Sequence, residues 1–393
     1  MRSEHSGSWY EPPRVAGETA AGPGERQEAI DALRGLCLVG IAIVNVPWIG
    51  FGENLLLQLG GWWEGTRALA AVDVVTAVGI EWLFEGKFYP QFSMLFGFGA
   101  GVLMARGMAI YARRLAVLLV FGVLHSTFGW WGDILLNYAL MGALLALLWK
   151  APARVTLAVA VLGYVASIGI SVAVDFDGWL NPTSSDLTEA LARAAQETAV
   201  YRDGTFASIT EHRIDELRAF FAPWEWSYRA NTVAMGAFGL WIQKTGWLAD
   251  VSRRRAALGR IAGWTLGFGV PLAIIPFLYI PIGDVLAVGY ASFFLWLAAR
   301  GSLDRVIPVL VPLGRCAISG YLGQTLAFTL FFYGYGLAMY GGITPWQGAL
   351  LSVSVWSAEV LLARLWLARF ALGPVEWLWR SLTYQRVLPL RRA

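Results

Sequence analysis

The sequence predicts an all-α polytopic membrane protein with about ten transmembrane helices. One further helix, near residues 64–87, is expected to be interfacial or re-entrant. Of the 393 residues, 57% are hydrophobic and only 15% are charged, whereas about 25% of the residues of a soluble domain are charged. Several segments also run for about 20 residues with few charges, which is the length of a helix that crosses a bilayer. A soluble all-helical protein would need polar outer faces, and these segments mostly lack them.

The apolar segments divide the chain into ten spans. Residues 64–87 are kept apart from them because Arg67, Asp73, Glu81, Glu85 and Lys87 make this helical segment too polar for a full span. The spans are placed at 30–50, 88–105, 111–130, 133–149, 153–175, 229–247, 257–279, 282–299, 310–337 and 346–370.

Basic residues between the spans give the orientation. With ten spans and a cytoplasmic N-terminus, the clusters around Arg106, Arg254, Arg300 and Arg391 all fall on the cytoplasmic side, as the positive-inside rule requires. Counting 64–87 as an eleventh span would put Arg34 on the wrong side. The expected protein therefore crosses a bacterial inner membrane several times, with both termini in the cytoplasm.

These spans define the expected domain organisation. Residues 1–28 form a disordered cytoplasmic tail, 29–175 a five-span half and 176–228 an extracytoplasmic loop with two short amphipathic helices. A second five-span half covers 229–372, and 373–393 form a cytoplasmic interfacial tail. In the loop, His212 lies among acidic residues, but the set falls short of a metal site.

The first span begins with charged residues at helical spacing. Asp31 and Arg34 are three residues apart, so they can pair on one helix face. Asn45 follows Arg34 by eleven residues, which places both on the same face about 16 Å apart. A polar track through the bundle is one interpretation. The other is that the charged pair anchors the helix end at the headgroups while Asn45 bonds to a neighbouring helix.

The most distinctive stretch is 121-FGVLHSTFGWWGDILLNYAL-140. His125 is the only histidine in an apolar segment, and Asp133 follows it across a short turn. Arg114 precedes His125 by eleven residues on the same face, and Asn137 lies one turn after Asp133. A carboxylate beside an imidazole orients it and raises its basicity, as a general base requires. The alternative is that His125 only fixes the hairpin through a hydrogen bond.

Glu359 lies centrally in the tenth span and needs a partner there. Arg315 or Tyr321 of the ninth span are the candidates, and a plain hydrogen bond between helices is equally compatible with the sequence. In the second span, Gly97, Gly99 and Gly101 favour close helix packing.

Other function classes find no support. The net charge of +3 is too small to indicate nucleic-acid binding, and the two cysteines lie in apolar segments, which argues against a disulfide framework. The sequence contains no phosphate-binding loop, no dinucleotide fingerprint, no paired haem histidines and no nucleophile elbow.

Several motifs together resemble the YeiB-like family, the domain of unknown function DUF418. They are DALRGLCLVGIAIVNV (31–46), GKFYPQFSMLFGFGAGVLMAR (86–106), YARRLAVLLVFGVLHSTFGWWGDILLNYALMGAL (111–144), GRCAISGYLGQT (314–325) and GPVEWLWRSLTY (373–384). The resemblance covers nearly the whole chain from residue 30. It implies a bacterial inner-membrane protein and leaves the reaction open.

A more distant resemblance connects the chain to transmembrane acyltransferases, which open with an Asp-x-x-Arg-Gly span like residues 31–35. In the sugar-modifying family the arginine is followed eleven residues later by a histidine, where this chain has Asn45. The glucosaminide family has its histidine in the next loop, and here residues 51–66 contain none. His125 is therefore the only intramembrane histidine that can serve an acyltransferase of this kind.

Three functions follow. The first is an acyltransferase-like enzyme in which Arg34 and Arg114 hold an acyl-thioester such as acyl-CoA, and His125, oriented by Asp133, activates a lipid or sugar acceptor. The second is a small-solute permease that uses Asp133, Asn45 and Glu359. The third is a non-catalytic assembly partner in the bilayer. A single cavity lined by Arg34, Asn45, Arg114, His125 and Asp133 would argue against the third.

Overall fold

The structure is a computed structural model that describes residues 23–52, 70–180, 184–217, 222, 225–275 and 279–391. Every regular element in these ranges is a helix, and the one β-type pairing among them is an isolated antiparallel bridge between Phe370 and Arg391. The predicted all-α class is therefore confirmed.

The helices follow one another with short connections. In the first part of the chain they are α1 (Pro23–Gly50), α3 (Ala71–Leu83), α4 (Phe88–Met104), α5 (Met108–Phe128), α6 (Leu135–Leu147) and α7 (Ala153–Leu180). Two helices of the central loop follow, α8 (Ser184–Asp203) and α9 (Phe206–Glu216). The remaining helices are α10 (Glu225–Thr245), α11 (Arg255–Leu272), α12 (Tyr279–Ala298), α13 (Ile307–Arg315), α14 (Ala317–Phe332), α15 (Pro345–Arg369) and α16 (Pro374–Tyr384).

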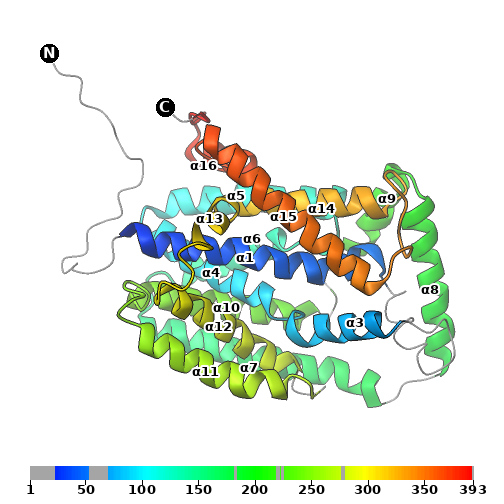
Figure 1. Cartoon of the computed structure of the whole chain (residues 1–393), viewed down its shortest axis with the longest axis horizontal. Helices are drawn as coiled ribbons and strands as arrows, with labels where there is room; N and C mark the ends of the chain where they lie inside the picture. Colours follow the sequence, from blue (N-terminus) through cyan, green and yellow to red (C-terminus); the bar gives the residue numbers. More distant parts are fainter. Residues whose placement is uncertain are drawn as a thin grey trace.

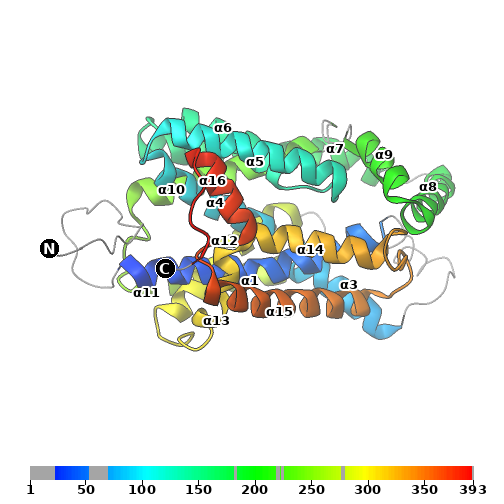
Figure 2. The ribbon, with the colours of Figure 1, turned by 90° about the horizontal axis from the view of Figure 1, so that it is seen from above.

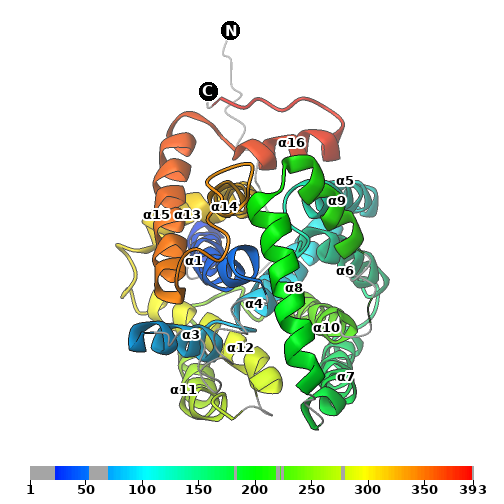
Figure 3. The ribbon, with the colours of Figure 1, turned by 90° about the vertical axis from the view of Figure 1, so that its right-hand side faces the viewer.

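The long helices run side by side along one axis (Figure 1). The start of α1 and the whole of α16 lie at one end of this bundle, and α8 and α9 lie at the other. Figure 3 looks onto that second end and shows α8 crossing it. Charged and amphipathic elements thus cover both ends of a mostly apolar bundle.

Burial differs sharply between the central and the outer helices. Four helices are long and apolar enough to cross a membrane, namely Glu28–Gly50 of α1, Met108–Phe128, Ala153–Ala173 and Pro345–Arg369. The span in α1 is 72% buried, whereas the one in α15 is only 17% buried. The outer helices expose side chains such as Leu162, Leu361 and Leu365. An apolar outer surface of this kind suits hydrocarbon rather than water and indicates membrane association.

The expected ninth span, 310–337, is not one helix. Two helices, α13 and α14, meet at Cys316, whose backbone leaves the helical region at φ −108° and ψ 30°. Gly314, just before this break, packs against the backbone of α1 so closely that a Cβ atom would collide with the Asp31 carbonyl. The break lets α13 follow α1 while α14 turns toward α5 and α6.

Other boundaries also differ from those expected. Helix α1 begins at Pro23, so residues 23–28 of the expected disordered tail are helical, while residues 1–22 lie outside the described residues. Helix α3 has 13 residues, which agrees with a non-spanning helix in the segment 64–87, although 64–69 are not described. The expected loop 176–228 starts inside α7 and contains the two predicted helices, of which α8 has 20 residues and is not short.

The expected packing role of the glycines is confirmed on α4. Gly97 faces the α10 backbone at Gly236, and Gly101 faces Gln243, so that neither position has room for a Cβ atom. Gly99 lies on the other side of the helix, close to Arg34. Helix α4 therefore packs tightly on α10 with one face and borders open space with the other.

Candidate functional site

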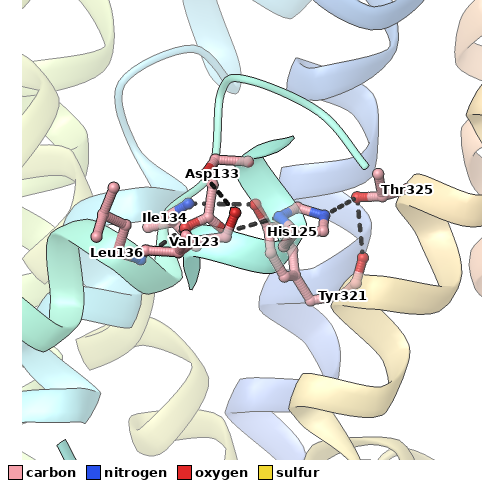
Figure 4. A network of polar contacts seen from close by, with 8 residues as sticks. Val123, His125, Asp133, Ile134, Leu136, Tyr321 and Thr325 are labelled. Atoms are coloured by element: carbon pink, nitrogen blue, oxygen red, sulfur yellow. Dashed lines mark hydrogen bonds and ion pairs between the residues drawn. The ribbon is translucent and has the colours of Figure 1, made fainter. Parts of the chain in front are cut away.

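His125 occupies the last turn of α5 and is buried, with 8% of its surface exposed. Its Nδ1 atom lies 2.6 Å from Oδ1 of Asp133, in the connection that leads into α6. The two helices come close here because Gly122 of α5 leaves space for the backbone of Leu136. The structure thus brings together the predicted histidine and carboxylate, as Figure 4 shows.

The second ring nitrogen of His125 also has a partner. Its Nε2 atom lies 3.0 Å from the hydroxyl of Thr325 on α14, 200 residues further along the chain. That hydroxyl is also 3.3 Å from the carbonyl oxygen of Tyr321, one turn earlier. On the opposite side, Oδ2 of Asp133 accepts a hydrogen bond of 2.6 Å from the amide of Leu136. In Figure 4 the imidazole stands between the carboxylate and the hydroxyl.

This arrangement accommodates both protonation states of His125. In the neutral ring, Nδ1–H donates to Asp133 and Nε2 accepts from the Thr325 hydroxyl. In the imidazolium, Nε2–H donates to Thr325, whose own proton turns to the Tyr321 carbonyl. No heavy atom has to move between the two states. An imidazole between a carboxylate and a hydroxyl is the arrangement of a general base.

A cavity of about 640 Å³ opens between α1, α4, α5, α14 and α16. Its charged lining consists of five arginines and three carboxylates: Arg34, Arg106, Arg114, Arg315, Arg380, Glu28, Asp31 and Glu376. The remainder is mostly apolar, with Leu38, Leu118 and Phe96 among the side chains, and Tyr321 and Ile134 at the far end. The volume is in the range of sites for small molecules.

The cavity is elongated along α1. Its lining on this helix extends from Glu28 to Ile41, which is about 20 Å at 1.5 Å per residue. The charged groups lie in the first turns, and the apolar groups lie deeper. The cavity is therefore polar and basic at its mouth and apolar at its base.

Tyr321 separates the base of the cavity from His125. It lines the cavity, and the centre of its ring is 5.1 Å from the centre of the imidazole. Its hydroxyl accepts a hydrogen bond of 3.3 Å from the amide of Ile134, which also lines the cavity. His125 and Asp133 themselves are not lining residues. They lie directly behind the wall that Tyr321 and Ile134 form.

The arginines at the mouth are held by specific contacts. Arg34 pairs with Asp31 at 2.7 Å, as their spacing predicts. The guanidinium of Arg114 lies 3.5 Å from the ring centre of Trp379 on α16, whose indole N–H donates to the Arg114 carbonyl. These contacts fix α16 beside the mouth, and Figure 2 shows it crossing between the two groups of helices.

Glu376 is also committed. Its carboxylate accepts hydrogen bonds from the amides of Ile318 and Ser319 and from the hydroxyl of Ser319. It therefore caps the N-terminus of α14, where a negative charge is favourable. Because this carboxylate is bound to α14, the arginines leave the mouth with an excess of positive charge.

The other predicted site residues lie elsewhere. Asn137 donates to the hydroxyl of Thr232 on α10 and thus links two helices. Glu359 was expected to pair with Arg315 or Tyr321, but its carboxylate instead accepts from the amide of Gln324 at 2.8 Å. Asn45 is half-buried and does not line the cavity. Arg34 and Arg114 thus line one cavity, His125 and Asp133 adjoin it, and the polar track to Asn45 does not form.

The sequence interpretation missed several residues of this region. Thr325 and Tyr321 come from the stretch GRCAISGYLGQT, and Trp379 and Arg380 from GPVEWLWRSLTY. Both motifs carried the family resemblance, and this was the only signal for them. Helical spacing cannot reveal a contact between residues 200 positions apart.

His212 has a modest role on α9. Its Nε2 atom lies 3.4 Å from a carboxylate oxygen of Glu216, one turn later. The hydrogen bond with Glu216 raises the pKa of His212 above its ordinary value of 6.5. No group of three or more metal-binding side chains occurs among the described residues.

Known proteins similar to the chain extend over its whole length. YxaH of Bacillus subtilis (strain 168), described as an uncharacterised protein, is 29% identical over 396 residues, covering 94% of this chain and 96% of YxaH. YeiB of Escherichia coli (strain K12), also described as uncharacterised, is 28% identical over 389 residues, covering 93% of this chain and 98% of YeiB. Residues 242–386 match the model of the family described as "Protein of unknown function (DUF418)".

The chain belongs to the YeiB-like DUF418 family. A third relative, an uncharacterised 39.9 kDa protein of Bacillus acidopullulyticus, is 27% identical and covers 93% of the chain. No solved structure matches the chain. The family match includes Thr325, Tyr321 and α16, while His125 and Asp133 lie in the part aligned with YxaH and YeiB.

Proposed function

We propose that this YeiB-like protein is an acyltransferase of the bacterial inner membrane. It spans the membrane ten times, takes an acyl-thioester from the cytoplasm and transfers the acyl group to a lipid or sugar hydroxyl. The observation that carries this proposal is the cavity, which has arginines at its mouth and the His125–Asp133 pair behind its base.

The cavity suits a thioester with a phosphorylated carrier. Arginines bind phosphate groups through several charge-assisted hydrogen bonds, and five of them line the cavity. An extended chain advances about 1.2 Å per bond, so a cavity of about 20 Å has room for some 16 bonds. This is the scale of the pantetheine arm that joins the phosphates of an acyl-CoA to its thioester. The thioester would then reach Tyr321.

The chemistry assigned to the site is a single acyl transfer. The acceptor hydroxyl takes the place of the Thr325 hydroxyl beside Nε2 of His125, and Tyr321 turns aside. Nε2 removes the proton as the oxygen attacks the thioester carbon. The carbon–sulfur bond breaks, and the leaving thiolate receives that proton from the imidazolium. Asp133 holds Nδ1–H throughout and stabilises the positive ring.

The orientation follows from the same end of the molecule. Arg106, Arg254 and Arg300 belong to connections between helices at the end where α1 begins. Such an arginine-rich end is typical of the cytoplasmic side. The mouth of the cavity would therefore open toward the cytoplasmic supply of acyl-thioesters, with both termini inside.

Binding and transfer by the protein in lipid nanodiscs test the proposal separately. We expect acetyl-CoA and octanoyl-CoA to bind, and Arg114→Gln to weaken binding about tenfold or more, since a hydrogen bond to a charged group contributes about 1.5–3 kcal/mol. Arg260→Gln is the matched control, because Arg260 is exposed on α11 and does not line the cavity.

Transfer of radiolabelled acetyl-CoA or octanoyl-CoA to lipid and glycan fractions of membrane vesicles tests the catalytic step. His125→Gln should leave binding intact and lower transfer by about 10²–10⁴-fold, the usual contribution of a general base. Full transfer by this variant would overturn the role of His125. Binding that is equal in Arg114→Gln and Arg260→Gln would overturn the donor site.

A further inference from the structure

Glu359 and Gln324 form a buried polar pair that the proposed reaction does not use. Glu359 lies in the middle of α15, and Gln324 lies on the neighbouring α14 with 2% of its surface exposed. The amide nitrogen of Gln324 donates to Oε2 of Glu359 at 2.8 Å and to the carbonyl of Leu38 on α1 at 3.2 Å. Three helices therefore meet at this pair.

The other two oxygens of the pair present a problem of hydrogen bonding. Oε1 of Glu359 and Oε1 of Gln324 are both buried, and neither has a partner among the described residues. Both are acceptors when Glu359 is ionised, so neither can satisfy the other. A buried acceptor without a donor costs about 1–3 kcal/mol, and a buried charge costs more.

We propose that Glu359 and Gln324 form a proton-binding site. A proton on Oε1 of Glu359 converts this acceptor into a donor, and Oε1 of Gln324 accepts from it. With the existing bond from the Gln324 amide to Oε2, the neutral acid and the amide then make two hydrogen bonds in opposite directions. One proton removes both the buried charge and the two unsatisfied acceptors.

The surroundings favour a proton over a metal cation. Gly320 and Gly323 of α14 face the carboxyl, and a Cβ atom on Gly323 would lie 3.1 Å from Oε1 of Glu359. The carbonyl of Leu38 already accepts from Gln324. Two oxygens therefore remain for a ligand, whereas metal cations bind through four or more ligands. A proton needs only the two oxygens present.

The charged and titratable groups on the helices that pack against α15 are held by contacts elsewhere. They are Asp31 and Arg34, which pair with each other; Cys37, which bonds to Gln91; Tyr321, which bonds to Ile134; Asp73, which accepts from the amide of Trp346; and Arg315, which approaches the Ala371 carbonyl. On α15 itself, Arg364 lies five residues toward the cytoplasmic end. The Gln324 amide is thus the group that Glu359 faces.

Infrared spectroscopy of the whole protein in nanodiscs at neutral pH tests the proposal directly. We expect a band from a protonated carboxyl group that shifts in D₂O and is missing from Glu359→Gln. In Gln324→Leu the band should move to higher frequency, because the acid loses its partner. Glu376→Gln is the matched control: this carboxylate accepts three hydrogen bonds, so its removal should leave the acid band in place.

Stability gives a second and independent measurement. The amide of Glu359→Gln can make the same two hydrogen bonds with Gln324 as the protonated acid, so its thermal midpoint at neutral pH should equal that of the wild type. Glu376→Gln should lower the midpoint, because it removes a charge that caps α14. Absence of the acid band in the wild type, or stabilisation by Na⁺ that Glu359→Gln abolishes, would overturn the proton site. Neither outcome depends on acyl transfer.

Discussion

At the scale of single residues, His125 is defined by having a partner on each ring nitrogen. Asp133 accepts from one nitrogen, and Thr325 can donate to or accept from the other. A histidine that only fixed the hairpin would need a single bond within α5 and α6. Instead its second bond joins the hairpin to α14, the helix that also contributes Tyr321 to the cavity.

The bond between His125 and Thr325 predicts a stability effect. Thr325→Val keeps the shape of the side chain but leaves Nε2 of a buried imidazole without a partner. We expect a loss of about 1–3 kcal/mol in the free energy of unfolding, measured by chemical unfolding in micelles. Thr325→Ser should stay close to the wild type, and an unchanged Thr325→Val would show that this bond contributes nothing.

His212 predicts a dependence of stability on pH. Its pKa is raised in the folded state by the hydrogen bond with Glu216, so the folded protein binds the proton more tightly than the unfolded chain. The stabilisation is complete below pH 6.5, the ordinary value, and is lost as the pH rises through the higher folded pKa. In thermal scans, the difference between wild type and His212→Gln should shrink over this range. A constant difference would contradict the assignment.

At the scale of elements, the helical pair α8–α9 is clamped over the hairpin that carries His125. Arg213 of α9 is fully buried, and its guanidinium donates to the carbonyl of Phe128 at the end of α5 and to the hydroxyl of Tyr335. Tyr201 of α8 stacks against Tyr333 and Tyr340 beyond α14. The outer side of the site is therefore closed by side chains that the central loop supplies.

Removing the clamp should loosen this end without unfolding the bundle. In Arg213→Met the length of the side chain is kept, but both hydrogen bonds are lost. Hydrogen exchange should rise in α9 and around Phe128 while it stays unchanged in α1 and α4, which do not contact α9. Arg202→Met, on the exposed face of α8, is the control. Equal exchange in both variants would show that Arg213 is not the clamp.

At the scale of the whole molecule, the distribution of apolar surface accounts for the fold. Helix α1 lies in the interior, while α7 and α15 expose leucine and valine along their length. Apolar outer helices can coexist with a polar cavity only if the surface faces lipid and the cavity opens at an end. This is why the arginines gather beside α16 and not along the sides of the bundle.

The proposed topology predicts which end each reagent can reach. Ala207→Cys on α9 should react with a membrane-impermeant thiol reagent in spheroplasts, and Ser302→Cys, between α12 and α13, should react only after the membrane is opened. Both positions are exposed, and the native Cys37 and Cys316 are buried, so the unmodified chain serves as the background. Labelling of Ser302→Cys in sealed spheroplasts would refute the orientation.

Much of the architecture could be predicted from local pattern. The helix positions follow from apolar length, and the contact between His125 and Asp133 follows from a hairpin that must return through a short turn. The break at Cys316 could not be predicted, because it depends on the close approach of Gly314 to α1. The partner of Glu359 was misassigned for a related reason: the rotation of α14 decides whether Tyr321 or Gln324 faces α15.

The sequence by itself determined the all-helical class, the family and the residues that carry the chemistry, because these depend on composition, periodicity and motifs along the chain. Only the tertiary structure decided which of those residues meet. Thr325 joins His125, Trp379 joins Arg114 and Gln324 joins Glu359 across large distances in the chain. Such contacts depend on how each helix is rotated and broken, and packing against all its neighbours sets both.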